Sequence, residues 1–115
     1  MRILIVTDAW QPQVNGVVRT LTRTRDELTR LGHDVHVLSP DLFRNMPCPT
    51  YPEIRLALLP ARKLTAMIEA LRPAAIHIST DGPLGQAARR YCRKRGLPFT
   101  TAYHTRFPEY IEARF

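Results

Sequence analysis

The chain has 115 residues, the length of one small domain, and its apolar content of 44% is ordinary for a globular protein. No apolar run approaches the roughly 20 residues of a membrane-spanning helix, and the apolar stretch at the start is too short for a signal peptide, so we expect a cytoplasmic protein. The net charge of +7 comes almost wholly from arginine, which favours bidentate contact with phosphate or carboxylate and predicts an anionic partner: nucleic acid, acidic lipid or a nucleotide.

The first thirty residues predict a buried strand, a loop and a helix. Residues 3–6 form an unbroken apolar run, which is typical of a strand covered on both faces. The loop over residues 8–16 ends in Asn15 and Gly16, directly before an amphipathic helix that we expect to begin at Val17. Two interpretations stay open: Asn15 caps the helix, or the helix N-terminus binds an anion such as phosphate.

The later elements follow in the order of an α/β protein. We expect strands at residues 35–38, 54–56, 74–78 and 98–103, helices at residues 62–71 and 83–95, and the start of another helix in residues 107–115. Gly32 and Gly96 supply helix stops, and the pair Arg72 and Pro73 closes the helix between them. Closely spaced prolines exclude helix and central strand from residues 42–52, which we expect to be irregular.

This order predicts a doubly wound, mostly parallel α/β sheet of Rossmann-like type, whose strands all end at one edge. Ligands of such sheets bind beyond that edge, at the point where the strand order reverses. Four segments should meet there: residues 8–16, 39–41, 80–82 and 104–106. Because they combine carboxylates, hydroxyls, an imidazole, a guanidinium and a helix N-terminus, they suit a polar, anion-bearing ligand.

Several residues at this edge have a structural alternative. His104 follows a buried strand among polar neighbours, where a titratable group can act, but it can also be an ordinary turn histidine. Asp8 can bind a ligand or cap its own loop, and Trp10 can be a stacking platform or a lid over the core. His77 lies within a strand, where a packed and hydrogen-bonded role is the more common one.

Other motifs are missing from the sequence. No G-x-G-x-x-G, P-loop, G-x-S-x-G or H-E-x-x-H occurs. Cys48 and Cys92 stand far apart with no metal-ligand spacing, so we expect neither a zinc site nor a disulfide framework.

Four blocks of the sequence, at residues 8–20, 39–41, 77–85 and 103–110, together resemble the N-terminal domain of retaining glycosyltransferases of the GT-B fold. The similarity is greatest to the branch that contains bacterial mannosyltransferases and glycolipid-forming glycosyltransferases. The resemblance implies transfer of a sugar from a nucleotide-sugar donor to an acceptor with retention of anomeric configuration, and no cofactor or protein-bound metal. It also implies a lipid acceptor, peripheral contact with the inner face of the membrane, and no nucleic-acid partner.

The resemblance assigns roles to individual residues. His104 would be catalytic, contacting the donor sugar near the reacting centre, while Asn15 and Gly16 would approach the donor phosphates. The cleft-lining or acceptor-binding residues would be Asp8, Trp10, Thr80, Asp81 and Arg106.

One departure from the family pattern is large. The chain stops at Phe115, without the second domain and its paired-glutamate motif that hold the donor. We therefore expect residues 1–115 to be a partial N-terminal, acceptor-side domain that is inactive alone.

Two other hypotheses compete with this one. A non-catalytic anion-binding module would dock on acidic lipid or nucleic acid through Arg89, Arg90, Arg93 and Lys94, with steep salt dependence. A phosphate-responsive signalling domain would use Asp8.

Overall fold

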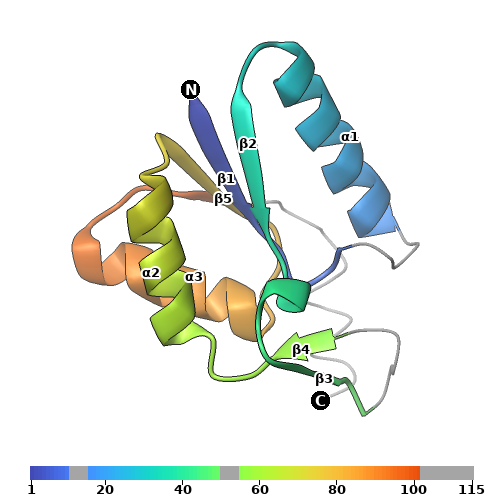
Figure 1. Ribbon diagram of the computed structural model, residues 1–115, viewed down its shortest axis with the longest axis vertical. Helices are drawn as coiled ribbons and strands as arrows, with labels where there is room; N and C mark the ends of the chain where they lie inside the picture. The colour runs from blue at the N-terminus through green and yellow to red at the C-terminus, as the bar shows by residue number, and fades with distance from the viewer. Residues whose placement is uncertain (11–15, 50–54, 102–115) are drawn as a thin grey trace.

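The computed structural model describes residues 1–10, 16–49 and 55–101 (Figure 1). Its centre is a four-stranded parallel sheet in the order β2-β1-β5-β6. The strands are β1 (Arg2–Val6), β2 (Asp34–Leu38), β5 (Ala75–Ile78) and β6 (Thr100–Thr101). The predicted α/β fold with a parallel, Rossmann-like sheet is therefore confirmed.

Helices flank this sheet on both faces (Figure 1). They are α1 (Gly16–Arg30), α2 (Ala61–Leu71) and α3 (Pro83–Arg95). Figure 1 shows α1 on one side of the strands, and α2 and α3 together on the other. Leu4 and Val6 belong to the buried core with residues of α2 and α3, whereas Ile3 and Ile5 line a cavity with Leu28 of α1. This alternation explains why residues 3–6 of β1 are all apolar, since each face of the strand is covered there.

The predicted helix ends agree with the backbone geometry. Gly96 follows α3 with a φ of 62°, and its N–H donates to the carbonyl oxygens of Arg93 and Cys92. Gly32, just after α1, has a φ of 95°. Arg72 ends α2 in the left-handed region with a φ of 48°, and the following Pro73 cannot continue the helix.

The segment predicted to be irregular contains regular structure. Pro40–Leu42 form a short 3-10 helix, η1, and Asn45–Pro47 form β3, which pairs antiparallel with β4 (Arg55–Ala57). The expectation of an irregular stretch over residues 42–52 was wrong for these three residues of β3. Proline excludes a central strand but not a two-stranded ribbon, where the N–H that Pro47 lacks can face outward.

The strand order fixes where a ligand would bind. From β1 the chain moves one way to β2 and then the other way to β5 and β6, so the order reverses between β1 and β5. These two strands are direct neighbours, with Val6 opposite Ile78. We call the edge where β1, β2, β5 and β6 end the carboxyl rim.

Candidate functional site

The carboxyl rim brings together three of the four predicted segments. The residues after β1, β2 and β5 lie there, and α1 begins at Gly16. Within the described ranges the rim holds the predicted site residues Asp8, Trp10, Gly16, Thr80 and Asp81. Asn15, His104 and Arg106 lie outside the described residues.

Asp8 and Thr80 form a buried polar cluster at the switch point. Asp8 is 7% exposed, and its Oδ2 accepts a hydrogen bond of 2.6 Å from the Thr80 hydroxyl. The same hydroxyl oxygen accepts the backbone N–H of Asp8 at 2.7 Å. These two hydrogen bonds between Asp8 and Thr80 link the end of β1 to the end of β5.

The Asp8 carboxylate also caps α3. Its Oδ1 accepts the N–H of Leu84 at 2.8 Å, and its Oδ2 accepts the N–H of Gly85 at 3.2 Å. Gly82, the residue before the helix, has no side chain to do this. The N-terminus of α3 attracts anions, so Asp8 occupies the position that an anionic ligand would take there.

Two glycines make this close packing feasible. A Cβ on Gly82 would lie 2.5 Å from Cγ of Asp8. A Cβ on Gly85 would lie 2.8 Å from the carbonyl carbon of Thr80 and closer still to its oxygen. Our sequence reasoning gave Gly85 no role. The sequence did indicate close packing at Gly85, because it places a glycine inside a predicted helix. Such a glycine costs about 1 kcal/mol of stability relative to alanine and therefore needs a packing reason.

Trp10 and Asp81 retain exposed surface at the rim, unlike Asp8. Trp10 is half-buried, and the guanidinium of Arg25 on α1 lies 5.3 Å from its ring centroid. Asp81 is 43% exposed and pairs with Arg89 of α3 at 2.6 Å. One face of Trp10 and one oxygen of Asp81 are therefore engaged, and the rest of each side chain can meet a ligand.

Gly16 differs from the glycines near Asp8. Among the described residues no atom would lie within 4 Å of a Cβ placed on it, and its φ is not in the left-handed region. Neither packing nor backbone conformation in this part of the chain requires glycine at the start of α1. Close approach of a ligand to the helix N-terminus is a remaining physical reason for it.

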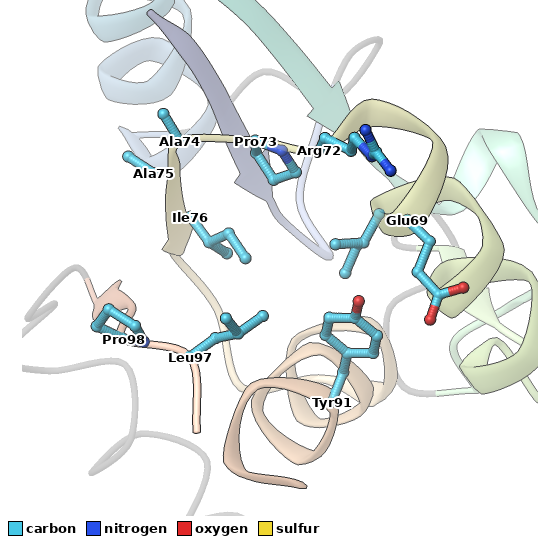
Figure 2. Close-up of a pocket in the computed structure, with 10 residues that line it drawn as sticks. Glu69, Arg72, Pro73, Ala74, Ala75, Ile76, Tyr91, Leu97 and Pro98 are labelled. Atoms are coloured by element: carbon cyan, nitrogen blue, oxygen red, sulfur yellow. The ribbon is translucent and has the colours of Figure 1, made fainter. Parts of the chain in front are cut away.

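A cavity in the described part of the chain lies away from the rim. It measures about 460 Å³ and opens between α2, α3 and the amino end of β5. Figure 2 shows the Tyr91 hydroxyl directed into the space that Ile76 and Pro73 also line. We place the candidate site at the carboxyl rim instead, because ligands of doubly wound sheets bind at the switch point.

The four basic residues proposed for an anion-binding module fall into two groups. Arg89 is engaged with Asp81, and its guanidinium lies 6.0 Å from the centroid of the Phe99 ring. Arg90, Arg93 and Lys94 are exposed on the far half of α3. That end of the helix borders the cavity at the amino end of β5, away from the switch point.

The titratable groups with a shifted pKa in the described residues lie away from the carboxyl rim. Side-chain hydrogen bonds from His36 and Arg2 lower the pKa of Asp34, which lies at the amino end of β2. Burial raises the pKa of the Cys92 thiol, which makes it a poor nucleophile. His77 is half-buried, with Nδ1 2.8 Å from the Thr100 hydroxyl, as expected of a structural histidine. In the three described ranges no group of three or more His, Cys, Asp or Glu residues could hold a metal ion.

Comparison with known proteins gives a family match. A model described as Glycosyltransferase Family 4 matches residues 14–115. The GDP-mannose-dependent alpha-mannosyltransferase of Mycolicibacterium smegmatis is 30% identical over 130 aligned residues, covering 98% of this chain and 35% of that protein. The alpha-monoglucosyldiacylglycerol synthase of Acholeplasma laidlawii is 28% identical over 125 residues, covering 96% of this chain and 31% of that protein.

The chain spans about a third of the length of these curated relatives. No solved structure matches it with statistical significance. No helix in the described residues is both long and apolar enough to cross a membrane.

Proposed function

This chain belongs to Glycosyltransferase Family 4, and from that membership we propose that it forms part of an enzyme that moves a sugar from a nucleotide-sugar donor to a lipid acceptor with retention. The names of its relatives support both substrates. One relative is named for GDP-mannose, a nucleotide sugar, and another for monoglucosyldiacylglycerol, a glycolipid. The alternative, a non-catalytic module that binds anions through α3, has less support, since Arg89 is engaged with Asp81.

The observation that carries the proposal is the contrast between the two helix N-termini beside the switch point. The N–H groups of Leu84 and Gly85 in α3 already donate to Asp8. At the start of α1, no described atom would lie within 4 Å of a Cβ on Gly16. The donor phosphates therefore bind at α1, near Asn15 and Gly16, where backbone N–H groups and the helix dipole stabilise negative charge.

His104 is the proposed catalytic residue, orienting the donor sugar at the reacting centre. The course of β6 supports this role. Since β6 runs parallel to β5, it directs the chain toward the same rim at which Gly16 lies.

The acceptor lies against the remaining rim residues. Trp10, Asp81 and Arg106 contact it, because Trp10 and Asp81 keep exposed surface. Asp8 and Thr80 fix the shape of the rim through their internal hydrogen bonds. The other side of the cleft belongs to polypeptide outside this chain, as the greater length of the relatives suggests. Residues 1–115 alone would then turn over slowly, because stabilising the transition state needs groups from both sides.

Product analysis tests this function directly. The full-length protein is incubated with one acceptor, diacylglycerol or a polyprenyl phosphate, and with one donor, GDP-mannose or UDP-glucose. We expect one donor to yield a glycolipid whose anomeric proton has the α configuration of the donor by NMR. A β-linked product would contradict retention, and no transfer from any nucleotide sugar would contradict the function.

Gly16→Ala tests the donor-phosphate site. The added methyl group should hinder the approach of the diphosphate to the backbone N–H groups and raise the donor KM about tenfold, a loss of about 1.4 kcal/mol. The free energy of unfolding should stay the same or increase slightly, because alanine favours helix and no described atom lies within 4 Å. Thr20→Ala, on an exposed position of the same helix, is the control. An unchanged donor KM in Gly16→Ala would exclude close contact there.

A further inference from the structure

The cavity of about 460 Å³ between α2, α3 and the amino end of β5 has the properties of a small-molecule site. We call it the α2–α3 cavity. Ile68 and Ile76 are buried and form part of its wall, whereas Leu97 and Pro98 line it and reach the solvent. Its volume lies within the range of roughly 300–1,000 Å³ that is usual for ligand pockets. A molecule could therefore enter it and cover a largely apolar surface.

One buried polar group in the wall of the α2–α3 cavity has no partner. Tyr91 of α3 is 7% exposed, and Figure 2 shows its hydroxyl directed into the cavity. That hydroxyl forms no hydrogen bond with any residue in the described ranges. Buried hydroxyl groups are almost always hydrogen-bonded, because leaving such a bond unmade is costly. A ligand in the cavity would supply the missing partner.

The Tyr91 ring is held in place by an ion pair that joins α3 to α2. The guanidinium of Arg95 lies 4.2 Å from the centroid of the ring. The same guanidinium pairs with the carboxylate of Glu69 at 2.8 Å. Because these contacts already fix Tyr91, a ligand that bonds its hydroxyl pays little to order it.

Arg72 gives the α2–α3 cavity a preference for an anion. It lines the cavity at the end of α2, is exposed, and pairs with no carboxylate of the described residues. Glu69, the carboxylate in the wall, is already paired with Arg95. Arginine favours contact with planar carboxylates. One unpaired cation and one hydroxyl suit a singly charged carboxylate better than a phosphate, whose second charge Glu69 would repel.

We propose that the α2–α3 cavity binds a small carboxylic acid with an apolar body. The apolar body packs against Ile68, Ile76 and Leu97. The hydroxyl of Tyr91 donates to one carboxylate oxygen, and the Arg72 guanidinium stabilises the negative charge.

This site goes beyond the proposed function and does not depend on it. The Asp8 carboxylate caps the first turn of α3 at the carboxyl rim. Tyr91 lies about 12 Å further along the same helix than Pro83, from a rise of about 1.5 Å per residue. An acid in the cavity therefore leaves the rim open to the sugar donor and acceptor.

Ligand-observed NMR on the full-length protein tests the site. The probes are three acids, hexanoate, phenylacetate and indole-3-acetate, and the uncharged analogue 2-phenylethanol. We expect at least one acid to bind, and phenylacetate to bind at least about threefold more tightly than 2-phenylethanol, as an exposed ion pair allows. No binding of any acid would overturn the proposal. Phenyl phosphate binding more tightly than phenylacetate would overturn the assignment to a carboxylate.

Two substitutions separate the roles of the polar groups. Tyr91→Phe removes only the hydroxyl and should weaken binding of the acid about tenfold, without lowering the stability of the protein. Arg72→Gln should weaken binding of the acid about threefold and leave 2-phenylethanol unaffected. Arg90→Gln is the matched control, because Arg90 is exposed on α3 and does not line the cavity. An equal loss in this control would assign the effect of Arg72 to net charge and overturn its role.

Leu97→Trp blocks the α2–α3 cavity without relying on a polar group. Leu97 is 39% exposed, so the larger ring should fill the cavity while the protein still folds, which circular dichroism checks. Binding of the acid should be lost. Wild-type binding in both Leu97→Trp and Tyr91→Phe would place the acid elsewhere and overturn the proposal.

A competition experiment distinguishes this site from the proposed function. GDP-mannose and UDP-glucose should leave the acid bound, and mutually exclusive binding would place the acid at the donor site and overturn the proposal. Acid binding without any sugar transfer would leave the cavity site standing and overturn the function. Sugar transfer without acid binding would do the reverse.

Discussion

Gly85→Ala is expected to prevent stable folding of this domain. The new methyl group would overlap the backbone of Thr80, where no side chain can rotate away. Overpacking of this kind typically costs about 1–3 kcal/mol. Moving α3 to relieve it would also lengthen the hydrogen bonds from Gly85 and Leu84 to the Asp8 carboxylate, each worth about 1.5–3 kcal/mol. The sum is a large part of the total stability of a small domain, about 5 kcal/mol at the low end.

Urea unfolding followed by circular dichroism measures this effect. Alanine is the better helix former by about 1 kcal/mol, so helix propensity alone predicts the opposite result. Gly16→Ala is the matched control, since it makes the same substitution at the start of another helix with no described atom nearby. A Gly85→Ala protein as stable as the control would show that Asp8, Thr80 and α3 are packed less tightly than described.

His104→Ala is expected to lower kcat about a hundredfold or more while changing nucleotide affinity much less. Removing one preorganised hydrogen-bond donor at a reacting centre typically costs 10²–10³ in kcat, about 2.7–4 kcal/mol. The proposed contact is with the donor sugar rather than the nucleotide, so nucleotide binding should be largely preserved. Steady-state kinetics and a nucleotide titration on the same full-length protein measure the two effects separately.

His33→Ala is the control for this experiment. His33 precedes β2 at the amino edge of the sheet, where its Nδ1 lies 3.1 Å from the N-terminal amine. The His33→Ala substitution should lower the free energy of unfolding slightly and leave kcat unchanged. If His104→Ala turned over at the wild-type rate, the catalytic assignment would be wrong even if the family and fold remained correct.

The sequence determined the main elements because their signals are local. The continuous apolar run of β1 predicted a strand covered on both faces, and Gly32, Arg72 and Gly96 marked helix ends that the backbone angles confirm. In the structure β1 and β5 are direct neighbours, so the loops that follow them flank the switch point. Element type depends on residues within one or two turns of each other, so a single sequence carries it.

The β3–β4 hairpin shows where local signals were insufficient. Its prolines correctly exclude a central strand, yet Asn45–Pro47 still pair with Arg55–Ala57. Pairing depends on a partner outside the local window, and a short edge ribbon tolerates proline.

The tertiary structure alone decided what Asp8 does. From the sequence, a ligand contact and a cap of its own loop were equally open, and the cap of α3 was neither of these. The partners that engage Asp8 lie 72 to 77 residues away along the chain, at Thr80, Leu84 and Gly85. Hydrogen bonds and close packing form between groups that the fold brings together, whereas a sequence pattern records only the groups that are near each other along the chain.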